Sequence, residues 1–530
     1  MAKINFLEEQ IPILRGPMPV LRLETPVLAA EATIERFART IAPGAEFRTL
    51  GNILRAAFDG PRMVAYVNPT SGESKVFPAL EDLKPGVEIS ARANAIALRF
   101  AADQELFPRD ATALVPLEAS TLMQARHTKG AERGKANEVL SYVRFQRQVN
   151  GYPVWGPGTR AMIAVDADGQ IRGFSHRWRK AVASGETVTP YSRAQLMRPI
   201  LAQIERSVPN ADVTVRKVTP GYFDNGGGVI QPVLRFGATI HAPKSRSGKR
   251  LPANSHVYGY VWIGEGFEPL PELGVLNGAP PTYAPQKRTQ RVAQPAAAGD
   301  PMVGRYVVRN DSADWVNSAN SFLGGLQMAN FFGSPIPFTD SQYYWAEPFE
   351  YVSDKDAFIN SVHIALTESH GNWGVFSTRD NHDDLVFLTD IPASGYGGAG
   401  SSLAYWTIHS CEVVPTQTDE STSFDVWWDI FQGLHAVTGY RTEIWINDGA
   451  TGPFGFAVGL GAPVVSSWLN AVASDDAYDE GDTYFDGNRN ITEPMGRASA
   501  IAVCGHGDDI VTDLGSLGPA SCLTEWWFNN

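Results

Sequence analysis

Two apolar runs in the C-terminal half of the chain each end in a side chain that could take part in catalysis. Residues 362–371 read VHIALTESHG and end in His370 and Gly371, and residues 403–411 read LAYWTIHSC and end in Cys411. A histidine that accepts the thiol proton leaves a thiolate, which is the nucleophilic form of cysteine. The backbone N–H groups of Gly371 and Cys411 are candidate donors to the oxyanion formed when a thiolate attacks a carbonyl. The pattern predicts a His/Cys dyad for acyl chemistry.

Strands are needed to position these two side chains. Both runs are continuously apolar, which is typical of strands buried in a parallel sheet. In open α/β sheets the ligand crevice lies at the carboxyl ends of the strands, so we expect His370 and Cys411 to meet there. The sequence predicts an alternation of strands and helices, which indicates an α/β layer, with strands at 357–367, 385–388, 403–408 and 440–446 and helices at 424–435 and 465–473.

The order of the two motifs resembles the caspase-like cysteine peptidases, which include caspases, gingipains, legumains and separases. In that group an apolar strand ends in His-Gly and a later one ends in a small residue and Cys. Residues 431–439 (FQGLHAVTG) and 466–471 (SSWLNA) are also similar to gingipain-like relatives. The resemblance covers residues 305–530. It implies a caspase-like domain with a mainly parallel sheet and a peptidase with Cys411 as nucleophile.

Two positions depart from this pattern. Caspases and metacaspases carry Gln or Asp two residues before the cysteine, whereas this chain has His409. The acidic pocket with which metacaspases read basic residues therefore cannot be carried over by position. Glu412 directly follows the proposed nucleophile, and its charge would raise the pKa of the thiol.

The N-terminal half of the sequence predicts a helix followed by an antiparallel meander, repeated, which is an α+β arrangement with a curved sheet. Residues 142–178 resemble the prodomains of thermolysin-type proteases and the related PepSY domains. The matching residues are Phe145, Gly151, Pro153, Val154, Gly156, Asp166, Asp168 and Gly169. In that family the module folds or inhibits a protease, which implies a zymogen. The predicted elements are helices at 30–41, 88–102 and 192–207, a hairpin of 62–67 with 74–77, and strands at 138–149, 160–165, 171–178, 229–241 and 255–263.

A segment rich in Pro, Ala and polar residues separates the two halves. We expect an α+β prodomain-like unit at 1–135, a second PepSY-like unit at 136–278, an exposed linker at 279–301 and the caspase-like domain at 302–530. The linker is the expected place for proteolytic nicking. If the chain processes itself, a cut at 279–301 should disappear when Cys411 is replaced.

Charge is distributed unevenly along the chain. Residues 301–530 hold 7 Lys and Arg against 30 Asp and Glu, while residues 1–300 hold 37 basic and 27 acidic residues. Opposite charges predict an intramolecular contact between the halves, although solubility alone is an alternative explanation. The acidic half would repel phosphates, which argues against a nucleic-acid partner. It would favour a peptide or protein substrate that carries positive charge.

Cysteine content, hydropathy and the N-terminal sequence predict where the protein is located. Three cysteines, Cys411, Cys504 and Cys522, are too few for a disulfide framework. Their number fits a reducing compartment, or one reactive thiol with buried bystanders. No run of about 18 apolar residues occurs, so we expect no membrane span. The N-terminus shows no basic-then-apolar signal pattern, which predicts a cytoplasmic protein.

Several other groups of residues are alternatives. Asp482, Asp486, Asn488 and Glu493 fit the spacing of a calcium loop, with Tyr484 as a departure and an acidic surface loop as the plainer interpretation. The run Cys504-Gly505-His506-Gly507 is a competing site. His382, Asp383 and Asp384 form a polar cluster that would need more histidines to hold a metal. We expect His363 to lie in the core, His409 to line the site, and His435 to be structural.

The residues together favour a cysteine-dependent peptidase preceded by a prodomain-like region that inhibits or assists it. It needs no cofactor, with calcium as a possible addition. One alternative is a non-catalytic binding or assembly protein on the same fold, because fold does not imply function. Another is a thiol acyltransferase or peptide ligase, which shares the acyl-enzyme step.

Overall fold

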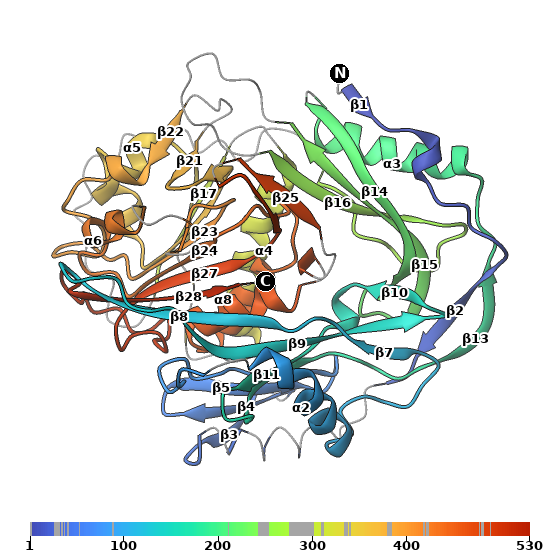
Figure 1. Ribbon diagram of the computed structural model, residues 1–530, viewed down its shortest axis with the longest axis horizontal. Helices are drawn as coiled ribbons and strands as arrows, with labels where there is room; N and C mark the ends of the chain where they lie inside the picture. The colour runs from blue at the N-terminus through green and yellow to red at the C-terminus, as the bar shows by residue number, and fades with distance from the viewer. Residues whose placement is uncertain are drawn as a thin grey trace.

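Strands from both halves of the chain join one continuous mixed sheet in the computed structural model (Figure 1). The structure describes residues 3–529 except 26–31, 33–34, 36–37, 40–41, 52, 87–88, 210, 242–253, 275–300, 309–311, 333–335, 337, 339–340, 379–383, 417–418, 420–422, 476, 479–481 and 488. Neighbouring strands in this sheet follow the order β18 (Ser341–Trp345), β17 (Val303–Val307), β19 (Ile364–Glu368), β23 (Tyr405–His409), β24 (Ala436–Tyr440), β27 (Ala498–Val503), β28 (Cys522–Phe528), β8 (Ser120–Thr128), β9 (Asn137–Val149), β11 (Ala161–Asp166), β12 (Ile171–His176), β6 (Glu73–Val76), β5 (Arg62–Asn68), β4 (Leu54–Asp59) and β3 (Glu46–Leu50).

The five strands from β18 to β24 are parallel, and the pairs that follow are antiparallel. The chain is therefore α+β with a large mixed sheet that is mostly antiparallel. The parallel strands all lie in the C-terminal half, where the sequence predicts a mainly parallel sheet, but they continue into antiparallel strands instead of forming a sheet of their own. One face of the parallel part packs against helices α4 (Ala313–Phe331), α7 (Thr451–Gly459) and α8 (Val464–Ala473). The other face packs against the short helices α5 (Pro348–Tyr351) and α6 (Trp427–Ile430). Alternation of side chains along each strand explains the two cores.

A curved part of the same sheet lies beside these strands and is drawn in green in Figure 1. Strand β10 (Tyr152–Trp155) joins the two parts, because it pairs with both β9 and β14 (Asp212–Phe223). The centre of the curved part is β14, β15 (Val229–Ile240) and β16 (Ser255–Trp262), all antiparallel. Helix α3 (Arg193–Ser207) packs against β16, since Gln203 Nε2 donates to Tyr260 O at 2.8 Å. Further strands extend this region, namely β1 (Lys3–Asn5), β2 (Met18–Leu23), β7 (Ala113–Pro116), β10 (Tyr152–Trp155) and β13 (Ala181–Val188).

Most predicted elements of the N-terminal half are confirmed. The hairpin is β5 and β6, and the helices predicted at 88–102 and 192–207 are α2 (Ser90–Asp103) and α3. Ser192 caps α3, with its hydroxyl accepting the N–H of Gln195, and Pro199 is accommodated inside the helix. The helix predicted at 30–41 lies largely outside the described residues, and so does the linker predicted at 279–301, apart from Pro301. How the chain divides into domains stays a prediction.

Three predictions for the C-terminal half are wrong in detail. The run 357–367 forms a strand only from Ile364, because residues before it make short 3-10 turns at Lys355–Ala357 and Ile359–Ser361. The strand predicted at 440–446 is wrong, because β24 (Ala436–Tyr440) ends where that prediction begins. The helix predicted at 424–435 is limited to a 3-10 turn (Ser423–Val426) and α6. Smaller elements complete this half: β20 (Gly371–Asn372), β21 (Val375–Ser377), β22 (Leu385–Phe387), β25 (Thr483–Asp486) and β26 (Ile491–Pro494).

Two of the three cysteines form a disulfide that the sequence did not predict. Cys504 and Cys522, at the ends of β27 and β28, are bonded, and Cys411 is free and buried. Disulfides persist mainly in oxidising compartments, whereas the cysteine count had favoured a reducing one. Among the helices in the described part of the chain, none is both long and apolar enough to cross a bilayer.

Candidate functional site

Neighbouring strands bring the His370 and Cys411 segments together. Strands β19 and β23 are parallel, with Glu368 opposite His409, and each candidate side chain follows two residues later. Beyond the paired strands, Ser369 N–H donates to His409 O at 3.3 Å, and the hydroxyls of Ser369 and Ser410 lie 3.4 Å apart. The two segments therefore lie side by side at the carboxyl edge of the parallel strands.

Gly371 lies tightly against the Cys411 segment. A Cβ atom added at this glycine would lie 2.4 Å from the carbonyl oxygen of Cys411 and 2.3 Å from both Ser410 Oγ and Val413 Cγ2. No side chain fits there unless the backbone of the Cys411 segment moves. The close approach explains why glycine follows the histidine.

Replacement of this glycine should therefore destabilise the fold. We expect Gly371→Ala to lower the free energy of unfolding by about 1–3 kcal/mol, the usual cost of overpacking a core. Urea unfolding followed by tryptophan fluorescence measures the change. Gly374→Ala is the control at a nearby glycine. Open space surrounds the added carbon there, so this variant should lose less stability, with only the backbone strain of a positive φ of 64° to oppose it. Equal losses in the two variants would contradict the packing argument.

Cys411 is enclosed in this conformation. Its side chain belongs to the core beside α4, the residue is 2% exposed, and Sγ accepts the N–H of Ile444 at 3.4 Å. Burial, and then the nearby carboxylates of Glu443 and Glu412, raise the pKa of the Cys411 thiol well above its usual value. The thiol is therefore protonated at neutral pH in this state. Glu412 adopts a left-handed conformation, with φ of 57°.

His370 is also buried, and it contacts a residue from the N-terminal half. Its Nδ1 is hydrogen-bonded to the hydroxyl of Ser255, the first residue of β16. Its ring meets the edge of Trp315 on α4, with the ring centroids 5.3 Å apart. Nothing in the local sequence around His370 indicates Ser255 as a partner, because 115 residues separate them.

The segment that begins at Ser255 runs along the chain that follows Glu443. His256 forms a parallel bridge with Trp445, and Ile446 N–H donates to His256 O at 2.8 Å. Next along β16, Tyr258 N–H donates to the side chain of Asn447 at 3.1 Å. Ser255–Tyr258 therefore lies as an extended, hydrogen-bonded segment beside both His370 and the Ile444 backbone that contacts Cys411.

A buried charged triad lies at the ends of the same two strands. His409 Nδ1 is 2.5 Å from Glu368 Oε2, and its Nε2 is 3.1 Å from Asp448 Oδ2. Burial alone would lower the pKa of His409, but the two carboxylates outweigh it and raise that pKa to about 10. The imidazole is therefore a cation at neutral pH. Ser318 on α4 donates to Glu368, and Tyr440 donates to Asp448.

The remaining sequence candidates are placed as follows. His363 is buried, and its Nδ1 accepts the N–H of Met302 at 2.9 Å, as expected for a core residue. Cys504 is in a disulfide, so the competing site lacks a free thiol. His382 and Asp383 lie outside the described residues, whereas Asp384 precedes β22.

The predicted calcium loop forms the hairpin of β25 and β26. Asp486 and Glu493 both pair with Arg489, and Glu493 also pairs with Arg441 at 3.0 Å. Asp482 lies 3.9 Å from Lys217 of β14, and Asn488 is not described. Calcium binding by this hairpin stays a prediction.

Basic side chains of the N-terminal half meet acidic ones of the C-terminal half. Arg160 pairs with Asp475 at 3.1 Å, and Lys217 lies near Asp482 as noted. A small cavity lies at this contact, lined by Arg216, Lys217, Thr219, Arg235, Gly237, Tyr258, Trp445 and Asp482. Ion pairs of opposite charge therefore connect the two halves at these two places.

Comparison with known proteins gives a family match without an assigned activity. The model of a family described as "Domain of unknown function (DUF6345)" matches residues 315–492, which include both His370 and Cys411. No match is found among curated proteins.

Three solved structures show distant likenesses. An uncharacterized protein from Eubacterium rectale ATCC 33656 is 12% identical over 48% of this chain and 86% of that chain, with a TM-score of 0.29. A secreted C11 cysteine protease from Bacteroides thetaiotaomicron, iotapain, is 11% identical over 39% and 67%, with a TM-score of 0.27. The C-terminal domain of Bacillus megaterium YpeB is 14% identical over 47% and 98%, with a TM-score of 0.21. At these values the likenesses carry no argument about activity.

Proposed function

We propose that this chain is a cysteine-dependent peptidase whose site is covered by its own N-terminal half in the conformation described here. The observation that carries the proposal is the register of β19 and β23. Glu368 pairs with His409, and His370 and Cys411 each follow their paired residue by two positions. The two segments are also hydrogen-bonded to each other. Two parallel strands that deliver an imidazole and a thiol to one edge have the composition that thiolate chemistry requires.

The proposed reaction begins with transfer of the Cys411 proton to His370. The thiolate attacks the scissile carbonyl, and the N–H groups of Gly371 and Cys411 stabilise the resulting oxyanion. His370 then gives its proton to the leaving amine, which leaves an acyl-enzyme that water hydrolyses. A thiol acyltransferase would differ only in the last step, where an amine or thiol replaces water.

The substrate side of the proposed site is acidic. Glu412 and Glu443 flank the thiol, and burial raises the pKa of each carboxyl to about 8 while the site is covered. Solvent access would return both to their ionised form. A peptide with Lys or Arg near the cleaved bond would therefore be favoured.

The cover resembles a bound peptide in its geometry. Ser255–Tyr258 is extended and bonds to the backbone of Ile446 and the side chain of Asn447, as a substrate strand would. The hydroxyl of its first residue, Ser255, is also hydrogen-bonded to Nδ1 of His370. Activity therefore requires that this segment move away.

Charge reversal on β14 should promote that movement. Arg216 and Lys217 are exposed and face the acidic half at Thr483 and Asp482. We expect R216E/K217E to increase the rate at which a peptidyl acyloxymethyl ketone with Lys or Arg at its reactive end labels Cys411, by at least about tenfold, because like charges then repel across the contact. Intact-mass spectrometry follows the labelling.

Two controls make this experiment decisive. R15E/R22E reverses two exposed charges of the same half and should label at the rate of the parent chain. Cys411→Ala in the R216E/K217E background should not label at all. Labelling that survives loss of Cys411, or no gain over R15E/R22E, contradicts the proposal.

The second candidate function is a binding or assembly protein in which Cys411 is a core residue. The observation that favours it is the enclosure of Sγ, which is buried and accepts a backbone N–H. Free cysteines commonly behave as small apolar side chains. In that case R216E/K217E exposes no reactive thiol, and the peptidyl probe labels neither variant.

A further inference from the structure

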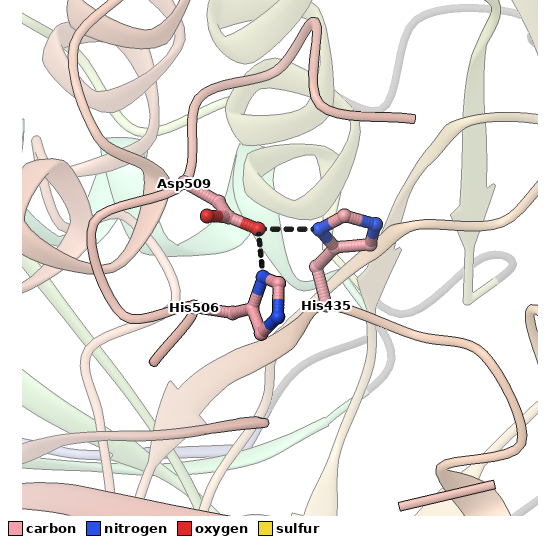
Figure 2. A group of neighbouring side chains, drawn as sticks. All are labelled: His435, His506 and Asp509. Carbon is pink, nitrogen blue, oxygen red and sulfur yellow. Dashed lines mark hydrogen bonds and ion pairs between the residues drawn. The ribbon is translucent and has the colours of Figure 1, made fainter. Parts of the chain in front are cut away.

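Three side chains remote from Cys411 have the donor set of a transition-metal site. His435, His506 and Asp509 each direct one ligand atom to a common region, and these atoms lie within 4.8 Å of one another (Figure 2). Asp509 Oδ2 is 2.6 Å from His435 Nδ1 and 2.8 Å from His506 Nδ1. One carboxylate oxygen is thus approached by two imidazole nitrogens.

The hydrogen bonds of His435 fix the position of its proton. Its Nε2 lies 2.6 Å from the carbonyl oxygen of Gly515, and a carbonyl only accepts, so Nε2 donates. In a neutral imidazole Nδ1 then carries a lone pair, which faces Asp509 Oδ2, another acceptor when the carboxyl is ionised. Two acceptors at 2.6 Å require a metal ion or a proton between them. Histidines that bind metals usually donate their other N–H to a carbonyl or carboxylate, as His435 does.

Rigid elements hold the three ligands. His435 directly precedes β24, and its backbone N–H donates to Ala404 O at 2.8 Å. The segment that carries His506 and Asp509 follows β27 and is anchored by the adjacent disulfide of Cys504. Because β27 is antiparallel to β24, both ligand segments lie at the amino edge of β24, opposite the edge of Cys411. The cluster is therefore separate from the proposed catalytic site.

Solvent reaches the cluster from one side. The side chain of His435 is 4% exposed, whereas that of His506 is 34% exposed. An ion can enter past His506 without movement of the core. A water molecule can occupy the same side as an additional ligand.

We propose that His435, His506 and Asp509 bind one divalent transition-metal ion, of which Zn²⁺ fits the donors best. Calcium and magnesium prefer oxygen ligands, whereas two imidazoles and one carboxylate suit zinc. Three protein ligands leave the fourth tetrahedral position to water. The bound ion would tie the start of β24 to the segment after β27. This site does not depend on peptidase activity, and it stands whether or not Cys411 is a nucleophile.

Zinc titration of untagged, oxidised protein by calorimetry tests the proposal. The parent for this test carries Cys411→Ala, which removes the free thiol as a competing ligand. We expect one Zn²⁺ per chain in the parent, and an affinity at least about 100-fold weaker after His506→Ala or Asp509→Asn, because each removes one of three ligands. His241→Ala removes an exposed histidine that directly follows β15 and should leave the affinity unchanged.

A second metal gives a readout that does not rely on affinity alone. Co²⁺ bound to nitrogen and oxygen ligands should give visible absorption in the parent and in His241→Ala, and His506→Ala should lose it. Zinc binding that is equal in the parent and His506→Ala overturns the proposal, as does zinc binding that is lost only with Glu493→Gln on the calcium-like hairpin. The absence of zinc binding in the folded parent also overturns it.

Discussion

The His409→Gln variant is expected to lose about 3–5 kcal/mol of unfolding free energy, which is the usual cost of removing one member of a buried ion pair. Glu368 and Asp448 are both within 3.1 Å of the His409 ring, and both side chains are nearly inaccessible. Without the imidazolium, two carboxylates remain in the core without their shared cation. Urea unfolding followed by circular dichroism measures the difference.

A matched variant separates this effect from the loss of a buried histidine. His363→Gln removes another buried imidazole, one whose ring accepts a backbone N–H at 2.9 Å. This variant should lose clearly less unfolding free energy, because no buried carboxylate in the described part of the chain pairs with His363. If the two variants lose equal stability, the triad does not carry the charge that its geometry implies.

The same triad predicts a dependence of stability on pH. The pKa of His409 is about 10 in the fold, against 6.5 for an ordinary histidine. A raised pKa means that the contribution is complete below about pH 6.5 and is lost as the pH rises to about 10. The stability difference between the parent and His409→Gln should therefore narrow over that range. A difference that widens toward pH 10 would contradict the assignment.

The second large effect is expected on catalysis. In the R216E/K217E background, hydrolysis of a basic fluorogenic peptide should fall to the uncatalysed rate with Cys411→Ala, because the nucleophile is gone. His370→Ala should lower kcat/KM by about 100-fold to 10,000-fold, the range typical of general acid–base catalysis. This prediction depends on the proposed function.

His363→Ala serves as the control for loss of a histidine near the sheet. It should leave kcat/KM of the opened variant nearly unchanged after correction for the folded fraction. An opened variant that hydrolyses the peptide equally well without His370 or without Cys411 would place the activity elsewhere, and the dyad assignment would then be wrong.

The sequence predicted individual helices and strands of both halves wherever the signal was local. Local patterns were sufficient for α3, with its Ser192 cap, and for the strands that precede His370 and Cys411. Each of these signals lies within a few residues of the feature it predicts, because propensity and hydrophobic period are local properties. The extent of the strand before Glu368 was wrong, since an apolar run also fits buried 3-10 turns.

Contacts between distant segments were beyond local patterns. Ser255 and Asp448 lie far in sequence from the histidines that they contact, and the Cys504–Cys522 bond depends on strands that pair only in the fold. A useful signal was present at His409, a polar residue at the end of an apolar strand. Its interpretation as a wall of the site missed its two buried carboxylate partners.

The pairing of β28 with β8 bears on how the molecule would respond to a break between its halves. Seven consecutive residues from Cys522 to Phe528 pair with residues 122–128. Backbone hydrogen bonds therefore join β28 to the N-terminal half. The fragments of a chain cut between residues 274 and 301 would remain one particle. On the proposed function, we therefore expect Cys411 to become accessible through movement of the Ser255–Tyr258 segment while the two halves stay joined.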